Sequence, residues 1–221
     1  MALYRNRIQD GKWDYFKDLF FFYKAFGLYS EQINHFIDTE VKVTKERYEG
    51  YVREIKDDDG FSDFEIFDHA SEMEAAQNLV DIYYDSLIMS LYSFTERKMY
   101  YLCKYLSKDY KVKVEDIAGT GIFKYKKYLS KVCGIDFAFI EEDWSILDDY
   151  NKLRNHLVHS EGNRSVNKGN NQLVAALKRF SGVKLSDEDE YITFHFSSDQ
   201  VAYDFINCVQ RILDYLYKEK H

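Results

Sequence analysis

One short segment of the chain combines a guanidinium, an amide and two imidazoles. Residues 154–159 include Arg154, Asn155, His156 and His159, and a stretch rich in Gly, Asn and Ser follows them. On a helix, Asn155 and His159 differ by about 40° around the axis and share a face. A guanidinium binds phosphate oxygens through its planar fork, and an imidazole transfers protons near neutral pH. These groups suffice to bind and cleave a phosphodiester without a metal ion.

The same segment also has a purely structural interpretation, which the spacing leaves open. Basic side chains near a helix C-terminus interact favourably with the helix dipole, by about 0.3–1 kcal/mol each. Metal binding by His156 and His159 is not expected, because no partner helix carries the Glu-x-x-His pairing of a di-iron bundle.

Composition restricts the class of protein. The 221 residues carry 30 Lys and Arg against 38 Asp and Glu, a net charge of −8, which argues against a protein that coats duplex nucleic acid. The complete lack of proline fits a mainly helical chain, and 18% aromatic residues exclude disorder. We therefore expect an all-α fold.

Cysteines and apolar segments predict a cytoplasmic protein. Cys103, Cys133 and Cys208 are scattered without a CxxC pair, which suits buried thiols in a reducing compartment. The N-terminus lacks the apolar core of a signal peptide, and the apolar run 19–23 is far shorter than the ~20 residues that span a bilayer. We expect no membrane partner, no metal and no cofactor.

The N-terminal part is predicted to be a helical extension. Apolar spacing predicts two helices over 12–56, with a break at Gly27 and Ser30 as the cap of the second. Residues 57–68 form an acidic segment that we interpret as a loop and as the domain boundary. The expected domains are therefore 1–69 and 70–221.

The second predicted domain is a helical bundle. A capping-box pattern at Ser71 predicts the start of a long central helix, which runs to about Leu106. Further helices are expected over 123–132, over 139–159 and after Asp199, with a loop over 160–171. Alternating β-formers favour a small hairpin before the last helix, made from residues 183–185 and 191–196.

The pattern Arg154-Asn155-x-x-x-His159 resembles the Arg-x(4–6)-His signature of HEPN domains (higher eukaryotes and prokaryotes nucleotide-binding), in which Asn often follows the Arg. The context is similar as well, since the motif ends a late helix and a loop and one long helix follow. Residues 92–97 look like the polar-interrupted central helix of these domains. The resemblance covers about residues 70–221 and implies a HEPN-like helical bundle with an N-terminal extension.

The resemblance also implies an activity. Many HEPN proteins are metal-independent endoribonucleases that form homodimers with a composite active site, in toxin–antitoxin pairs, phage defence and CRISPR effectors. His159 would then act as general acid or base, Arg154 would stabilise the transition state, and Asn155 would orient His159 or the phosphate. Glu96 is a candidate supporting residue, and His156 is a second one. Cleavage would leave a 2′,3′-cyclic phosphate.

Other partners and roles stay open. An antitoxin protein is an expected partner beside RNA, and some HEPN proteins are inactive interaction or nucleotide-binding modules instead. Residues 104–131 contain eight lysines against three acidic residues, and residues 161–184 contain five basic residues against one acidic residue. Both segments flank the motif helix and are interpreted either as an RNA-binding rim or as ordinary solvated surfaces.

Overall fold

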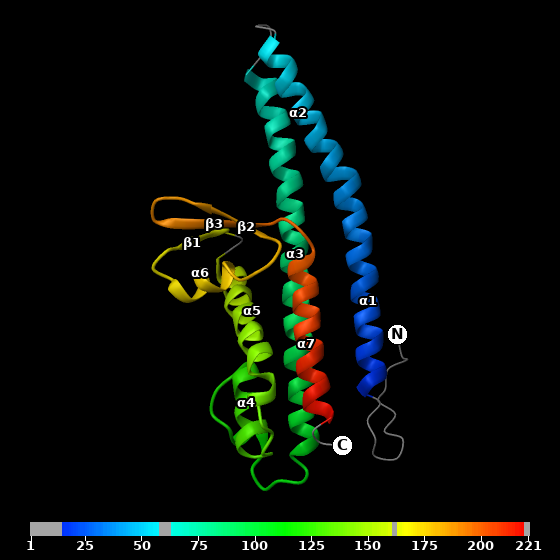
Figure 1. Ribbon diagram of the computed structural model, residues 1–221, viewed down its shortest axis with the longest axis vertical. Helices are drawn as coiled ribbons and strands as arrows, with labels where there is room; N and C mark the ends of the chain where they lie inside the picture. Colours follow the sequence, from blue (N-terminus) through cyan, green and yellow to red (C-terminus); the bar gives the residue numbers. More distant parts are fainter. Residues whose placement is uncertain (1–14, 58–62, 161–162, 219–221) are drawn as a thin grey trace. The chain divides into compact units, whose positions relative to one another are not determined.

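The computed structural model describes residues 15–57, 63–160 and 163–218 (Figure 1). The chain divides into two compact units, Met1–Asn78 and Leu79–His221, and each is considered by itself. The described residues are mostly helical, as predicted, with one small sheet. No helix among them has the length and apolar character that crossing a membrane requires.

The helical break predicted in the first unit lies at a different place. Helix α1 (Tyr15–Phe36) continues through Gly27 and Ser30, and a π-helical turn (Ile37–Val41) joins it to α2 (Lys42–Asp57). Ser30 is buried inside α1 and does not cap a helix. A glycine within a helix costs only about 1 kcal/mol, which does not end it. The Thr39 hydroxyl instead donates to the His35 carbonyl oxygen at 2.8 Å, a contact typical of bent helices.

The start of the central helix was also predicted wrongly. Helix α3 (Asp63–Leu106) begins eight residues before Ser71, so residues 63–68 are helical and only 58–62 of the expected acidic loop lie outside the described residues. Acidic residues are tolerated well in the first turn of a helix, so the charge of this segment does not exclude a helix there. Helix α3 passes through the predicted boundary at 69/70, and the division into units falls at 78/79.

The second unit is built on the C-terminal part of α3. Beside it lie α4 (Gly121–Lys131), α5 (Glu141–His159) and α7 (Gln200–Lys218), with short 3-10 turns at Val114–Asp116 and Ala138–Ile140 (Figure 1). The predicted apolar stripes of α3 and α7 are buried: Val80, Tyr84, Leu87, Leu91 and Phe94, and Val201, Phe205, Val209, Ile212 and Leu216. The three cysteines are free and buried, as expected.

Aromatic packing holds the motif helix α5 against α7. The rings of Tyr150 and Phe205 stack with centroids 3.9 Å apart. The Tyr150 hydroxyl donates to the Val201 carbonyl oxygen at 2.6 Å, so this buried phenol is satisfied. The orientation of α5 about its own axis is thereby set, and with it the side on which Arg154 lies.

A three-stranded antiparallel sheet follows the motif helix. Strands β2 (Val183–Asp187) and β3 (Tyr191–Phe196) form the predicted hairpin, and β1 (Ser165–Asn167) pairs with the other edge of β3. Strand β1 lies within the segment 160–171 that was predicted as loop, and α6 (Asn171–Leu177) was not predicted. Strand β1 has one buried residue, Val166, which is too little for a recognisable period.

Candidate functional site

Helix α5 presents Arg154 to α3. The guanidinium carbon lies 5.7 Å from the centre of the Tyr92 ring, within the range of a cation–π contact. Its Nη1 atom donates to Asn155 Oδ1 at 3.0 Å. Arg154 makes no ion pair with any residue that the structure describes, and its side chain is only partly buried. The guanidinium is therefore oriented and still has donors for a ligand.

Two residues that the sequence analysis missed support Arg154. The Tyr92 hydroxyl donates to Asn151 Oδ1 at 2.7 Å, and Asn155 Nδ2 donates to the same oxygen at 3.4 Å. Asn151 precedes Arg154 by three positions and Asn155 by four, which is the spacing of neighbours on one helix face. That spacing was the available signal for Asn151. Tyr92 lies in the segment 92–97 that the resemblance points to, but no spacing relates it to the motif, because its partners lie on another helix.

Tyr92 stays neutral in this environment. Burial is the main cause that raises the pKa of its phenol, and the Glu96 carboxylate adds to the effect, while Arg154 opposes it. The neutral phenol donates a hydrogen bond to Asn151 Oδ1 and adds no negative charge next to Arg154. The surroundings of Arg154 are therefore polar and uncharged at its nearest contacts.

Glu96 lies near this cluster but does not bind the motif. It follows Tyr92 by one turn of α3, and its Oε1 atom lies 3.3 Å from the position that a Cβ atom on Gly121 would occupy. Gly121 opens α4 with a positive φ of 59°. Neither a hydrogen bond nor an ion pair joins Glu96 to Arg154 or His159 in the described structure. Glu96 acts on the cluster through the electrostatic field at Tyr92.

His159 ends α5 in an exposed position, and within the described residues it makes no hydrogen bond. Asn155 shares its helix face, as predicted, but within the described residues the side-chain hydrogen bonds of this amide go to Arg154 and Asn151. Within one chain, Asn155 therefore orients Arg154. His159 lies beyond this network, and its exposed side chain can reach a ligand or a second chain.

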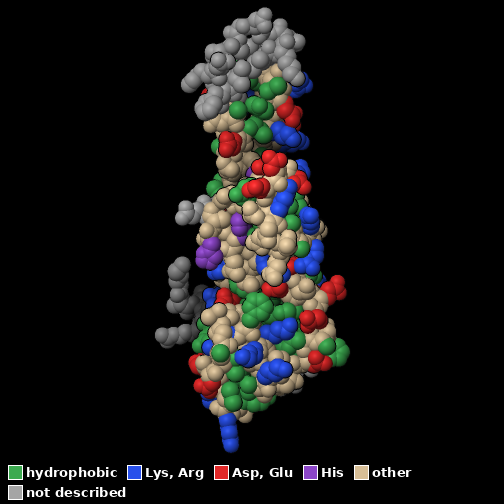
Figure 2. Space-filling model, turned by 90° about the vertical axis from the view of Figure 1, so that its left-hand side faces the viewer, with side chains coloured by type: hydrophobic (Ala, Val, Ile, Leu, Met, Phe, Trp, Pro, Cys, Tyr) green, Lys and Arg blue, Asp and Glu red, His purple; other side chains and the backbone are tan. Residues whose placement is uncertain are grey.

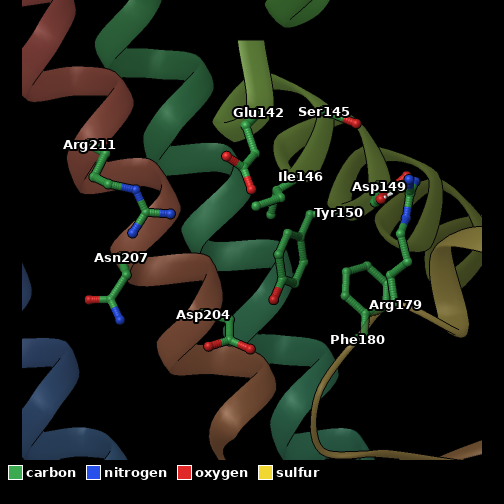
Figure 3. Close-up of a pocket in the computed structure, with 10 residues that line it drawn as sticks. All are labelled: Glu142, Ser145, Ile146, Asp149, Tyr150, Arg179, Phe180, Asp204, Asn207 and Arg211. Atoms are coloured by element: carbon green, nitrogen blue, oxygen red, sulfur yellow. Dashed lines mark ion pairs between the residues drawn. The ribbon is translucent and has the colours of Figure 1, made fainter. Parts of the chain in front are cut away.

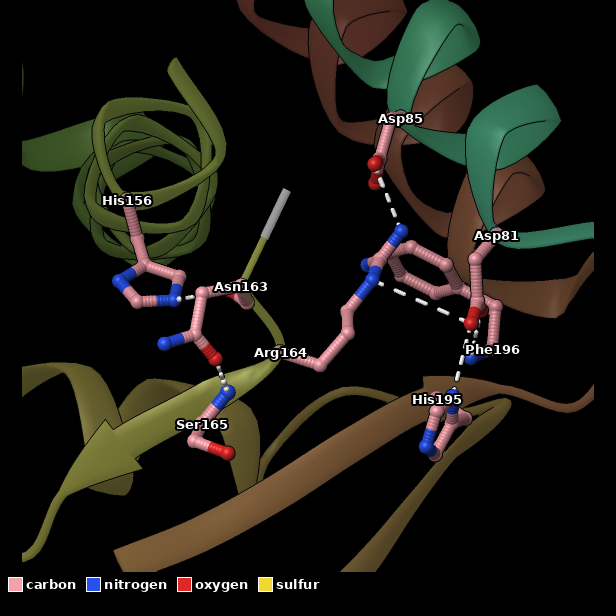
Figure 4. Close-up of polar contacts among 8 residues, drawn as sticks. All are labelled: Asp81, Asp85, His156, Asn163, Arg164, Ser165, His195 and Phe196. Atoms are coloured by element: carbon pink, nitrogen blue, oxygen red, sulfur yellow. Dashed lines mark hydrogen bonds and ion pairs between the residues drawn. The ribbon is translucent and has the colours of Figure 1, made fainter. Parts of the chain in front are cut away.

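His156 faces the sheet, away from Arg154. Its Nε2 atom lies 3.1 Å from the Asn163 carbonyl oxygen, and its ring centroid is 5.8 Å from that of Phe194 (Figure 4). Burial lowers its pKa, and the nearby Arg164 adds to this effect. The neutral ring then donates Nε2–H to the carbonyl. The structure therefore separates His156 from the other motif residues.

A second polar cluster lies where the chain leaves the motif helix (Figure 4). Arg164 Nη2 bonds Asp85 Oδ2 at 2.6 Å, and the guanidinium lies 5.2 Å from the Phe194 ring centre and 5.1 Å from that of Phe196. Asp81 accepts from the Phe196 amide at 3.1 Å and pairs with His195 Nδ1 at 2.7 Å. The cluster joins α3 to the sheet.

Burial dominates the electrostatics of this second cluster. The side chain of Arg164 is 12% exposed and that of Asp81 is 4% exposed. Burial raises the pKa of Asp85 to about 6, against the lowering effect of Arg164. Two buried atoms, Arg164 Nη1 and Asp85 Oδ1, have no hydrogen-bond partner among the described residues. The positive charge of Arg164 and the carboxylates of Asp81 and Asp85 therefore compensate one another within the fold.

A cavity of about 370 Å³ lies on another flank of α5 (Figure 3). Its lining combines aromatic rings with charged and amide side chains: Glu142, Ser145, Ile146, Asp149, Tyr150, Arg179, Phe180, Asp204, Asn207 and Arg211. Asp149 pairs with Arg179 and with Lys152. Asp149 and Arg154 are about 140° apart around α5, so the cavity is separate from the motif.

The described residues offer no cluster of His, Cys, Asp and Glu side chains that could hold a metal ion.

Comparison with known proteins finds no matching protein-family model, no matching curated protein and no matching solved structure.

Proposed function

We propose that the protein is a metal-independent endoribonuclease of the HEPN type that works as a homodimer in a prokaryotic toxin–antitoxin or phage-defence system. The observation that carries this proposal is the state of Arg154, whose guanidinium is oriented by Asn155 and Tyr92 and lacks a carboxylate partner within the described residues. A phosphodiester supplies the missing negative charge, and its two non-bridging oxygens can accept two parallel N–H bonds from the guanidinium fork.

His159 supplies the proton transfer in this proposal. An imidazole acting as base removes the proton of the RNA 2′-hydroxyl, and the 2′-oxygen attacks the adjacent phosphorus. The bond to the 5′-oxygen breaks, that oxygen receives a proton, and a 2′,3′-cyclic phosphate remains. Arg154 stabilises the negative charge that develops on the phosphoryl oxygens. In a composite site, the histidines of two chains serve as base and acid.

The exposure of His159 supports a site shared by two chains. The end of α5 leaves this ring accessible, and Asn155 is already engaged with Arg154 and Asn151. A base without an orienting partner in its own chain is poorly prepared for catalysis, because the tautomer and ring angle are not held. A second copy of the motif in a dimer provides groups that hold it.

RNA cleavage by the purified protein tests the proposal. End-labelled single-stranded RNA is incubated with wild type, Arg154→Ala and His159→Ala, and products are analysed for cyclic phosphate ends. We expect each variant to lose at least about a hundredfold in rate, as is typical when a proton-transfer or oxyanion-stabilising group is removed. Activity should persist in EDTA.

Matched controls separate loss of chemistry from loss of charge. Arg97 and His35 are exposed helical residues outside the motif, so Arg97→Ala and His35→Ala should cleave at the wild-type rate. Full cleavage by both Arg154→Ala and His159→Ala contradicts the proposal, as does a strict requirement for added metal. Failure of the wild type to cleave varied RNAs favours the alternative, an inactive HEPN-like interaction or nucleotide-binding module.

A further inference from the structure

Helix α4 differs from the rest of this acidic protein in its charge. Its eleven residues contain Lys124, Lys126, Lys127 and Lys131 and no Asp or Glu, in a chain whose net charge is −8. The expected solvated helix of an acidic protein mixes both signs, with acidic and basic residues alternating on the exposed face. Helix α4 is therefore a local basic element.

An aromatic side chain lies on the same face as the lysines. Phe123, Lys127 and Lys131 follow one another at four-residue spacing and are all exposed, and Phe123 retains 47% of its surface. The buried residues Ile122, Tyr128 and Leu129 hold the opposite face of α4 in the core. The lower part of the face in Figure 2, over α4 and the start of α5, shows Lys and Arg side chains interspersed with hydrophobic ones.

Two of these lysines have no ion-pair partner in the part of the chain that the structure describes. Lys127 and Lys131 make no ion pair with any described residue, whereas Lys126 pairs with Glu141 at 3.6 Å and lies 4.6 Å from the centre of the Trp144 ring. The fold therefore already uses Lys126 to join α4 to α5. The ammonium groups of Lys127 and Lys131 remain available for an external anion.

A further exposed lysine lies in a loop at the C-terminal end of α4. The Tyr110 hydroxyl donates to the Cys133 carbonyl oxygen at 3.3 Å, and the Tyr128 hydroxyl donates to the Val112 carbonyl oxygen at 3.1 Å. These two bonds hold the loop that carries the exposed Lys111 at the C-terminal end of α4. We name Lys111, Phe123, Lys127 and Lys131 the α4 surface.

We propose that the α4 surface binds single-stranded RNA, the substrate of the proposed nuclease, on whose assignment this inference rests. Unpaired lysines neutralise phosphates, and an exposed aromatic ring stacks with a base. A base is available for stacking only where the strand is unpaired, so Phe123 favours single-stranded over duplex RNA.

The position of α4 makes it an extension of the substrate-binding surface. On the α3 side, Glu96 Oε1 lies 3.3 Å from the position that a Cβ atom on Gly121, the first residue of α4, would occupy, and Glu96 follows Tyr92, the ring under Arg154, by one turn. Along α5, Arg154 lies about 20 Å beyond Glu141, the partner of Lys126. An RNA strand that reaches both Arg154 and the α4 surface must extend well beyond the scissile phosphate. The α4 surface thus selects long unpaired segments.

Binding and cleavage are measured separately to test this inference. Fluorescence anisotropy with a labelled oligouridylate is recorded at several salt concentrations, in a His159→Ala background that leaves the RNA intact. The double variant Lys127→Gln/Lys131→Gln should reduce the slope of log Kd against log salt by about 1.4, because each phosphate contact to a single strand contributes about 0.7. Phe123→Ala should weaken binding about tenfold with an unchanged slope.

The control uses lysines outside both basic segments. Lys24 and Lys42 are exposed and lie on α1 and α2, so Lys24→Gln/Lys42→Gln should retain the wild-type affinity and slope. Circular dichroism confirms that each variant is folded. Unchanged binding by both α4 variants overturns the inference, and so does an equal loss in the control. Equal affinity for polyglutamate, with the same response to Phe123→Ala, also overturns it.

The two proposals fail in different ways. RNA binding that depends on α4 in a protein that never cleaves leaves the α4 surface in place and contradicts the nuclease. Cleavage that depends on Arg154 and His159, with binding indifferent to α4, confirms the nuclease and contradicts the α4 surface.

Discussion

Two arginines near the end of α5 have opposite environments. Arg164 is 12% exposed, lies against two aromatic rings and pairs with Asp85 at 2.6 Å. Arg154 lies over one ring, binds the amide of Asn155 and has no carboxylate partner in the described residues. An arginine side chain thus stabilises the fold at position 164 and is a candidate ligand-binding group at position 154. The positions of the carboxylates decide which role each has.

The two environments also differ in what removing the arginine leaves behind. Around Arg164, the carboxylates of Asp81 and Asp85 are largely buried and depend on it for compensation. Around Arg154, the neighbours Tyr92, Asn151 and Asn155 are neutral and retain bonds to one another. Removal of Arg164 therefore leaves buried carboxylate charge without a compensating cation, whereas removal of Arg154 leaves no buried charge uncompensated.

The largest effect expected from this comparison is on stability. Arg164→Ala should lower the free energy of unfolding by about 3–5 kcal/mol, because breaking a buried ion pair leaves an uncompensated charge. Arg154→Ala should change it by no more than about 1 kcal/mol, because a partly buried neutral hydrogen bond is lost and no charge is left unpaired. Urea unfolding followed by circular dichroism measures both values.

A second pair of variants checks the cause of that effect. Arg164→Lys keeps the charge and loses the planar group between the rings, so its loss should be smaller than that of Arg164→Ala. Equal stability losses for Arg154→Ala and Arg164→Ala would show that the two environments do not differ in the way we describe.

A smaller effect is expected at Tyr92. Tyr92→Phe removes the donor to Asn151 and keeps the ring under Arg154, so we expect a loss of about 0.5–1.5 kcal/mol in unfolding free energy. Ser93→Ala is the control, because this exposed hydroxyl bonds only its own helix, at the Met89 carbonyl oxygen. Circular dichroism during urea unfolding compares the two. A Tyr92 variant as stable as its control would mean that this network does not hold α5 to α3.

The sequence predicted the helical stripes because each depends on local periodicity. Tyr84, Leu87 and Leu91 recur at helical spacing, and the structure buries all three as expected. The start of α3 was missed because Ser71 matches a capping pattern inside a helix that begins earlier. A local pattern identifies a good cap but does not show that the chain uses it.

Contacts between distant residues were outside the reach of local patterns. Arg164 and Asp85 are separated by 79 positions, and His195 and Asp81 by 114, so no spacing relates them. For the motif, spacing predicted that Asn155 and His159 share a face, but the partners of Asn155 depend on Tyr92 of another helix. Residue types indicated the chemistry available, and tertiary contacts determined which groups remain free to perform it.

A dependence of stability on pH is also expected at Asp85. Its folded pKa is raised to about 6 from an ordinary value of 3.8, so the folded state binds the proton more tightly than the unfolded state. This group therefore favours folding below about pH 4, and that contribution is lost as the pH rises through 6. The residue in Asp85→Asn does not titrate. The melting temperature of this variant should therefore rise relative to that of wild type as the pH increases from 4 to 7. Thermal unfolding across that range measures the difference, with the exposed Asp109→Asn as control. If the difference in melting temperature between wild type and Asp85→Asn stays constant with pH, Asp85 is ionised throughout this range because Arg164 stabilises its charge. The buried cluster would then be a permanent ion pair, and its contrast with Arg154 would be sharper still.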